Sequence, residues 1–392
     1  MNTYSDLRKV AKQMLTEEIL PFWLRLRDDE NGGFFGYVDN IGRIDKEAPK
    51  GVILHSRILY TFADAYRVTG RDEYLRASDH AYRFLVEKAL DPSYGGLYWM
   101  LDYAGEPLQD FKHSYNQAFG IYALSTYALA SGEPKALSCA MDLFRLLEAK
   151  WRTPTGYREQ LSRDYLPVSN EELSENGIIA DRTMNTVLHI MEAYTVFFEA
   201  TRDADVLEAL RYSVACLTES MYNKERVRLD VFFDTNLVSL LDLHSYGHDI
   251  EASWLIDRAV ATIGDDDLRD RTAPTTKALY DHVMRKAYTT RGVYFECENG
   301  RDDTKRDWWV QAEAVVGILN DAGREKFTPA HLLSMAAILE YIGKEIKAPS
   351  GEWYWTTYEN GSHDEKRELA GPWKCPYHNG RMCIEMMRRI RA

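Results

Sequence analysis

Histidines occupy several positions in this sequence where the surrounding helical pattern is largely apolar. His248 lies in GHDIEASWLIDRA, and Glu251 and Trp254 follow at three-residue spacing, which places them on one face of a helix. His378 stands at the start of the last predicted helix, in GPWKCPYHNGRMCIEM, with Trp373 shortly before it. Because the ordinary pKa of imidazole lies near neutral pH, these side chains suit general acid–base catalysis.

Three further segments place polar side chains in apolar helices. Asn185 and His189 are four residues apart in DRTMNTVLHIMEAYT, Arg57 is embedded in GVILHSRILYTFADAY, and DWWVQAEAV pairs Trp309 with Glu313. Taken singly, each has a structural explanation: a histidine can be a satisfied core residue, an arginine can close an ion pair, and a Trp–Glu pair can combine packing with a surface charge. Together they favour one polar cavity, because burying so many polar groups separately is costly.

The elements that position these residues repeat along the chain. A glycine followed by aromatic and alternating residues recurs roughly every 60 to 70 residues, which indicates repeated supersecondary units. Each copy predicts a short β-hairpin or extended loop. The clear copies begin at Gly32, Gly95, Gly292 and Gly351, and weaker ones begin at Thr155 and Arg228.

Between these copies, apolar residues at three- and four-residue spacing predict about twelve helices. The predicted helical segments are 3–27, 53–69, 73–89, 113–130, 133–150, 180–202, 205–221, 247–264, 273–287, 308–320, 328–345 and 377–391. Paired into six hairpins, each bridged by a β element, they predict an all-α fold, an (α/α)6 barrel with the β elements at one rim beside its mouth. An open solenoid is the alternative, since closure rests on count and regularity. With no linker-like segment, residues 1–392 are expected to form one catalytic domain.

The composition narrows the possible ligands. The net charge is −13, and no basic run or basic aromatic stripe is present, so neither nucleic acid nor an acidic membrane surface is an expected partner. The chain has 25 Tyr and 9 Trp, whose flat faces suit sugar rings, although core filling accounts for most of them. A neutral small molecule is the expected ligand.

Several classes of site have no signal in the sequence. There is no dinucleotide fingerprint, P-loop, H-E-x-x-H or G-x-S-x-G motif. The five cysteines are scattered without a C-x-x-C pair, so neither a disulfide framework nor a zinc site is predicted. No signal peptide or membrane-length apolar stretch is recognised, so a cytoplasmic protein is expected. No sustained heptad pattern occurs, which makes a monomer the expectation.

The chain resembles the cellobiose 2-epimerases of the N-acylglucosamine 2-epimerase superfamily over essentially its whole length, and GHDIEASWL is the most specific marker. The resemblance implies an (α/α)6 barrel in which His248 and His378 form the acid/base pair and His189 is the third active-site histidine. It also implies substrate-contacting or supporting positions for Arg57, Tyr115, Asn185, Glu251, Trp254, Trp309, Glu313 and Trp373.

The same resemblance implies a substrate, a β-1,4-linked disaccharide such as cellobiose, lactose or mannobiose, with glucose or mannose at its reducing end. Removing the C2 hydrogen of the opened sugar leaves an enediolate, for which Arg57 is the candidate stabilising cation. Neither a metal nor a nicotinamide cofactor is needed. The alternatives are an aldose–ketose isomerase on the same scaffold, an (α/α)6 glycoside hydrolase that uses Glu251 and Glu313, and a sugar-binding protein without activity.

Overall fold

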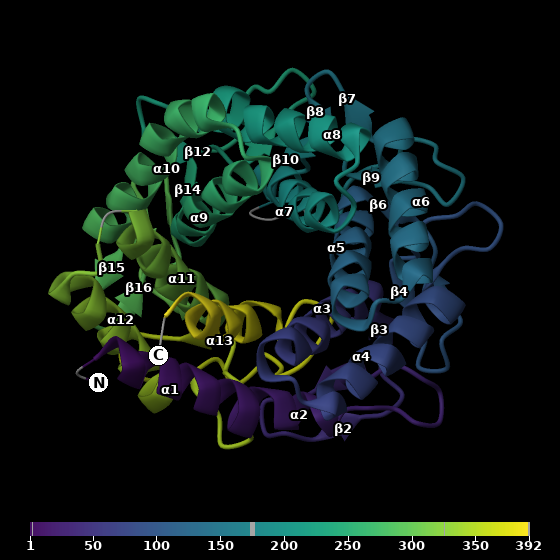
Figure 1. Ribbon diagram of the computed structural model, residues 1–392, viewed down its shortest axis with the longest axis horizontal. Coiled ribbons are helices and arrows are strands. Elements are labelled where there is room, and N and C mark those ends of the chain that lie inside the picture. The colour runs from purple at the N-terminus through teal and green to yellow at the C-terminus, as the bar shows by residue number, and fades with distance from the viewer. Residues whose placement is uncertain (2, 173–176, 325, 391–392) are drawn as a thin grey trace.

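Helices of the chain alternate between an inner and an outer ring (Figure 1). The computed structural model describes residues 1, 3–172, 177–324 and 326–390. The inner helices are almost wholly buried, which explains why their sequences, apart from that of the polar last helix α13, are largely apolar on all sides. They are α3 (Val52–Thr69), α5 (Ser114–Ser131), α7 (Met184–Thr201), α9 (Tyr246–Ile263), α11 (Trp308–Arg324) and α13 (Tyr377–Arg389).

The outer helices have one apolar face, which covers the inner ring, and one solvent face. Several of them continue into π-helical turns, labelled η. They are α1 (Tyr4–Gln13) with η1 (Met14–Ile19) and α2 (Leu20–Leu24), α4 (Asp72–Phe84) with η2 (Leu85–Ala89), α6 (Pro134–Lys150), α8 (Ala204–Ala215) with η3 (Cys216–Met221), α10 (Asp266–Lys286), and α12 (Pro329–Tyr341) with η4 (Ile342–Ile346).

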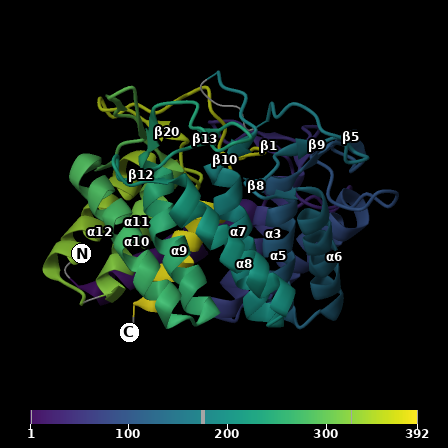
Figure 2. The same ribbon diagram turned by 90° about the horizontal axis from the view of Figure 1, so that it is seen from above.

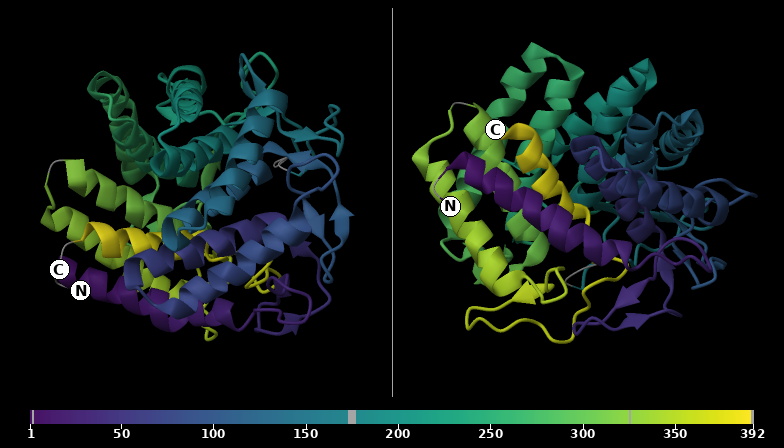
Figure 3. Two further views of the ribbon diagram at one scale, coloured as in Figure 1. Left: turned by 45° about the vertical axis from the view of Figure 1, so that its right-hand side comes forward. Right: turned by 60° about the horizontal axis from the view of Figure 1, so that its bottom comes forward.

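The ring of inner helices is closed. Each inner helix packs on the next, and α13 packs back onto α3. The predicted (α/α)6 barrel is therefore confirmed, and the open solenoid is wrong. The predicted pairing is wrong in its connections: the β elements link one hairpin to the next instead of bridging each hairpin, and α13 packs on α1, so the two ends of the chain lie side by side (Figure 3). The reason is that the chain begins with an outer helix, whose inner partner comes last.

The two ends of the barrel differ. At one end, tight turns join α3, α5, α7 and α9 to the outer helices that follow them, and glycines with positive φ end α3, α5 and α9 at Gly70, Gly132 and Gly264. At the other end, the long connections and their β elements form a rim (Figure 2). The predicted location of the β elements at one rim is thus confirmed.

Short antiparallel strands pair with one another and connect neighbouring parts of this rim. The strand before each inner helix from α3 to α11 pairs with the next connection, and a bridge between Val38 and Ala370 joins the first connection to the last. The sheets are β1 (Tyr37–Val38) with β2 (Ile44–Asp45); β3 (Lys50–Gly51), β4 (Met100–Leu101) and β5 (Pro107–Gln109); β6 (Lys112–His113) with β9 (Gln160–Leu161); β7 (Arg152–Thr153) with β8 (Gly156–Tyr157); β10 (Arg182–Thr183) with β13 (Phe232–Phe233); β11 (Tyr222–Asn223) with β12 (Arg228–Leu229); β14 (Leu243–Ser245), β17 (Glu296–Glu298) and β18 (Arg301–Asp303); β15 (Tyr288–Thr289) with β16 (Gly292–Val293); and β19 (Arg306–Asp307) with β20 (Thr356–Thr357).

Helix α10 starts at Asp266, well before the predicted segment 273–287. The Asp265 side chain accepts a hydrogen bond from the Leu268 amide and caps the helix, while Pro274 lies inside it. The acidic first turn and the proline concealed this start, because both are typical of loops. None of the helices within the described ranges combines the length and apolar character that spanning a bilayer requires.

Buried polar side chains form hydrogen bonds that hold the glycine-rich repeats against the inner helices. Gln117, the fourth residue of α5, accepts a hydrogen bond from the Leu97 amide at 2.7 Å and donates to the Leu97 carbonyl at 3.0 Å. Gln311 occupies the same position in α11 and makes the same pair of bonds to Val293 at 2.8 and 2.9 Å. These side chains satisfy backbone groups that burial would otherwise leave unpaired.

Lysines lie fully buried just before several inner helices, at Lys50, Lys112 and Lys374. Each pairs with a buried carboxylate: Lys50 Nζ lies 2.7 Å from Asp28, and Lys374 Nζ lies 2.9 Å from Glu352. Replacing one partner of such a pair leaves an uncompensated charge in the interior.

Lys50→Met is therefore expected to lower the free energy of unfolding by about 3–5 kcal/mol, because Asp28 loses its cation. Urea unfolding followed by circular dichroism measures the change. Lys344→Met, which breaks an exposed pair with Glu340, is the matched control and should cost less than about 1 kcal/mol. Equal effects at the two lysines would contradict this account of the rim.

Candidate active site

A cavity of about 520 Å³ opens at the rim end of the barrel axis. Its wall combines the first turns of the inner helices with residues of the rim, and its volume lies within the range of about 300–1,000 Å³ that is usual for small-molecule sites. The predicted residues that line it are Arg57, Tyr115, Asn185, His189, His248, Glu251, Trp309, Trp373 and His378.

His248 lies in the first turn of α9. Its Nδ1 is 2.7 Å from the hydroxyl of Ser245, and its ring packs on Trp309 with 4.8 Å between ring centroids. The residue lines the cavity, and its Nε2 has no hydrogen-bond partner within the described residues. Burial, followed by the nearby His189, lowers the pKa of His248 to about 3. The ring is therefore neutral near pH 7 and can accept a proton.

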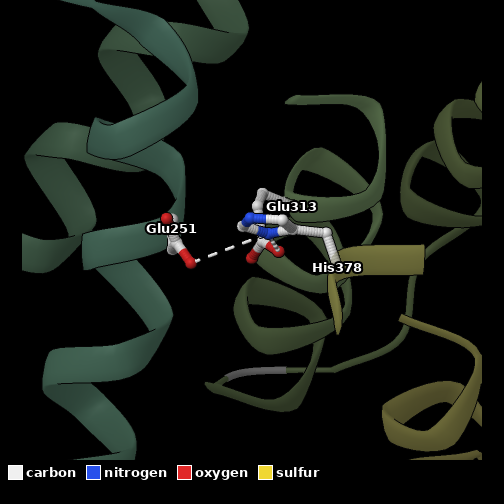
Figure 4. A group of neighbouring side chains, drawn as sticks. All are labelled: Glu251, Glu313 and His378. Atoms are coloured by element: carbon white, nitrogen blue, oxygen red, sulfur yellow. Dashed lines mark hydrogen bonds and ion pairs between the residues drawn. The ribbon is translucent and has the colours of Figure 1, made fainter. Parts of the chain in front are cut away.

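His378 approaches the same tryptophan from α13, with 5.5 Å between the two ring centroids. Its Nδ1 lies 2.7 Å from Glu313 Oε1 and 4.0 Å from Glu251 Oε1. Figure 4 shows the three side chains pointing toward one another. Since an ionised carboxylate only accepts, the Glu313 contact holds a proton on Nδ1 and leaves Nε2 with its lone pair. Burial and then the charge of Arg381 lower the pKa of His378 well below its ordinary value.

His189 has the same arrangement as His378. Its Nδ1 lies 2.9 Å from Glu192 Oε2, and its ring meets that of Tyr115 edge-on at 5.2 Å. One turn earlier on α7, Asn185 presents a carbonyl oxygen that has no hydrogen-bond partner in the described structure. The wall of the cavity therefore contains an unsatisfied polar acceptor.

Arg57 is a buried cation without a carboxylate partner among the described residues. Its Nη2 donates to the Tyr115 hydroxyl at 2.8 Å, and Nη1 lies 3.7 Å from Cys375 Sγ. Aromatic rings surround the guanidinium, which lies 4.2 Å from the ring centroid of Phe119 and 4.9 Å from that of Tyr377. A buried charge left without a counterion is costly, which marks this position as a site for a negative ligand group.

Two predicted substrate-binding residues, Trp254 and Glu313, lie behind the cavity wall instead of lining it. Both are completely buried, and the Trp254 indole donates to Glu313 Oε2 at 3.0 Å. Helical spacing places both on the correct side of their helices but cannot tell the cavity wall from the layer beneath it. Their contacts are with other side chains, so their place is a supporting one.

Two buried residues that the sequence analysis missed hold the predicted ones. Arg381 contacts Glu192, Glu251 and Glu313 and does not line the cavity. Glu192 follows His189 by three residues and Arg381 follows His378 by three, so the same helical spacing that singled out His248 and Glu251 was the available signal.

Oxygens of Glu251 and Glu313 and a nitrogen of His378 converge closely enough to suggest a cation site. Arg381 already supplies a cation there, because its Nη2 lies 2.5 Å from Glu251 Oε1 and 2.8 Å from Glu313 Oε1. This donor set is therefore satisfied by a guanidinium.

The outer part of the cavity is built by the rim. Trp355 and Arg367 stack at its mouth, with the guanidinium 3.6 Å from the ring centroid. Asp307, at the end of β19, is buried and accepts a hydrogen bond from the Thr356 hydroxyl at 2.5 Å; burial raises its pKa to about 6. These residues were not predicted from the sequence, because loop residues have no helical spacing to align them.

The fold and this site define an (α/α)6-barrel protein with an acid–base cavity. The profile of the family described as N-acylglucosamine 2-epimerase (GlcNAc 2-epimerase) matches residues 33–380. A cellobiose 2-epimerase of Ruminococcus albus is 46% identical over 382 residues, which cover 96% of this chain and 97% of that protein. The solved structure of the cellobiose 2-epimerase of Bacillus thermoamylovorans B4167 matches with a TM-score of 0.94 and 41% identity, and the match covers 98% of this chain and 100% of that one.

A D-mannose isomerase of Marinomonas mediterranea is a more distant relative, 25% identical over 95% of each chain. The chain belongs to the N-acylglucosamine 2-epimerase family. It is a carbohydrate epimerase, an enzyme of the isomerase class. The resemblance described from the sequence and the predicted sugar 2-epimerase function are therefore confirmed.

Proposed function

We propose that the protein interconverts glucose and mannose at the reducing end of β-1,4-linked disaccharides, with cellobiose, lactose and mannobiose as candidate substrates. The observation that carries the proposal is that His248 and His378, from the separate helices α9 and α13, pack on one tryptophan ring at the wall of one cavity. The names of the most similar relatives support the disaccharide.

The reaction begins with ring opening, because the C2 hydrogen is acidic enough to remove only when C1 is an aldehyde. A histidine Nε2 then takes the C2 proton: the C2–H bond breaks, its electron pair forms the C1–C2 double bond, and the aldehyde oxygen becomes an enediolate oxyanion. Return of a proton to the opposite face inverts C2. His248 and His378 serve either as bases on two faces or on one face with rotation of the intermediate.

The other predicted residues bind and orient the sugar in this proposal. Arg57, held by Tyr115, stabilises the oxyanion, while Asn185 and His189 hold the C1 and C2 oxygens. Glu251 offers a hydroxyl-binding oxygen, because its Oε2 has no hydrogen-bond partner in the described structure. The rings of Trp309 and Trp373 stack on sugar faces.

Trp254 and Glu313 contribute indirectly, by holding His378. The stacked Trp355 and Arg367 at the mouth lie where a second sugar unit would extend. We further propose that residues 1–392 act as a single catalytic domain, as a monomer in the cytoplasm and without a metal ion. The closed ring of inner helices supports the single domain.

The test is to incubate the protein with cellobiose or lactose in D2O and to follow C2 by NMR. Deuterium entering C2 together with a manno-configured product supports the proposal. A keto product of the lactulose type would instead favour the aldose–ketose isomerase. Release of free glucose from cellobiose would favour a hydrolase, which the geometry disfavours, because Glu251 and Glu313 both bind the same Arg381 nitrogen and cannot flank a glycosidic bond.

Gly247→Ala is expected to raise the KM for cellobiose about two- to tenfold, equivalent to the roughly 0.5–1.5 kcal/mol of an aromatic contact. An added Cβ would lie 2.4 Å from the Trp309 ring and push it out of place, and Trp309→Ala should act in the same direction. Gly323→Ala, where the Cβ meets nothing within 4 Å, is the matched control. An unchanged KM in Gly247→Ala and Trp309→Ala would refute the stacking role.

A further inference from the structure

Arg381 is completely buried on α13, one turn after His378. Its Nη1 donates to Glu192 Oε1, and its Nη2 donates to Glu251 at 2.5 Å and to Glu313 at 2.8 Å. The guanidinium is sandwiched by aromatic rings, 4.2 Å from the centroid of Tyr377 and 4.8 Å from that of Trp254. One side chain thus gathers carboxylates from α7, α9 and α11 behind the cavity.

Two of these carboxylates are also the partners of active-site histidines. Glu192 contacts His189 Nδ1, and Glu313 contacts His378 Nδ1. His248 differs from both, because its Nδ1 faces the Ser245 hydroxyl. The histidines of the cavity therefore divide into two that are linked through one guanidinium and one that is not.

We propose that Arg381 is a positioning residue that sets the tautomer and orientation of His189 and His378 together, acting through Glu192 and Glu313. A buried carboxylate without a cation takes up a proton, and a neutral carboxyl can donate to Nδ1 instead of accepting from it. The proton of the imidazole then moves to Nε2, and the nitrogen that faces the cavity loses its lone pair. The effect of Arg381 on proton transfer to and from the sugar rests on the proposed function. Its effect on the tautomers of the two histidines does not.

Arg381 acts on the pKa of both carboxylates: its charge opposes, without cancelling, the rise that burial causes at Glu313, and together with His189 and Tyr377 it outweighs that rise at Glu192. Although burial alone would raise it, the charge of Arg381 holds the pKa of Glu192 below its ordinary range. The charged and titratable groups that face His378 come from every inner helix near it: Arg57 on α3, His189 and Glu192 on α7, Glu251 on α9, Glu313 on α11, and Tyr377 and Arg381 on α13 itself. Without the guanidinium, either Glu313 becomes neutral or His378 binds a proton more readily.

A neutral Glu313 and a more readily protonated His378 both move the acid limb of the activity profile in the same direction. A neutral Glu313 has to ionise, or a protonated His378 has to lose its proton, before Nε2 can act as a base. Arg381→Gln should therefore lower kcat by about 10–100-fold, the usual effect of losing an outer partner of a reacting group, and leave KM largely unchanged. The acid limb of its kcat/KM profile should move to higher pH. Arg381→Lys keeps the charge and should recover part of kcat and of the limb.

Imidazole ¹⁵N NMR tests the same inference without turnover. In the unaltered protein His189 and His378 should carry the proton on Nδ1, and in Arg381→Gln both should lose that signature while the signals of His248 stay in place. His248 is the internal control, because it belongs to the same cavity but is held by Ser245. Failure of C2 exchange in the unaltered protein would refute the proposed function. The ¹⁵N NMR signals would still test whether Arg381 sets the tautomers of His189 and His378.

If Arg381→Gln does not fold, the double variant Arg381→Gln/Glu251→Gln removes one charge of each sign, and Glu251→Gln alone is its reference. The displaced acid limb and the lost Nδ1 signature should then appear in the double variant relative to that reference. Retention of the Nδ1 proton on both histidines, or a fall in kcat with an unmoved acid limb, would overturn the proposal and reduce Arg381 to a structural ion pair.

Discussion

His378→Ala and His248→Ala are each expected to abolish C2 deuterium exchange with cellobiose while the protein remains folded. Loss of a general acid–base group lowers the rate by about 10²–10⁴-fold, and each imidazole has a different place around the proposed substrate. The fold should survive because both side chains end at the cavity, and Glu313 keeps its bonds from Arg381 and Trp254 when His378 is removed. NMR of the exchange and thermal unfolding measure the two effects.

The matched control is His331→Ala. His331 lies in the first turn of the outer helix α12, where it pairs with Asp321 and caps the helix, and it does not line the cavity. Its removal should leave C2 exchange intact. Substantial exchange in either cavity variant would contradict the role assigned to that histidine.

Periodicity made the architecture predictable from sequence because the inner helices are buried on all sides and the outer ones on one. The apolar runs around Arg57 and His189 are long enough to indicate helices, and the recurring glycines mark the connections between them. Closure was not predictable in the same way. It depends on α13 reaching α3 and on the Val38–Ala370 bridge, which join segments from opposite ends of the chain.

The candidate site was predictable where a polar residue interrupts an apolar helix face, as at His248 and His378. The partners of these residues were harder to find, because the contact between His378 and Glu313 joins two distant segments. Whether a side chain lines the cavity or lies in the layer behind it was harder still to predict. Trp254 was expected to bind substrate but lies one layer behind the cavity wall. Arg381 was missed because an arginine near the end of a chain is ordinarily a surface residue.

Substitution of Arg57 should affect activity and stability very differently. It is buried, its charge is compensated only by Tyr115, Cys375 and aromatic faces, and no carboxylate within the described ranges pairs with it. A buried charge without a counterion is costly, so an apolar side chain of similar size in its place should leave stability unchanged or raise it. Since a residue that costs stability persists only through what it does, Arg57 is where negative charge should develop during the reaction.

Arg57→Met is therefore expected to lower kcat by about 10²–10³-fold, the effect of losing an oxyanion donor, with unchanged or increased Tm. Arg57→Lys keeps the charge without the planar fork and should be intermediate. Arg381→Met is the comparison variant. It leaves three buried carboxylates without their cation and should lower the free energy of unfolding by about 3–5 kcal/mol. A fall in Tm for Arg57→Met as large as that for Arg381→Met, or an unchanged kcat, would show that Arg57 is held for structure and that the oxyanion is stabilised elsewhere.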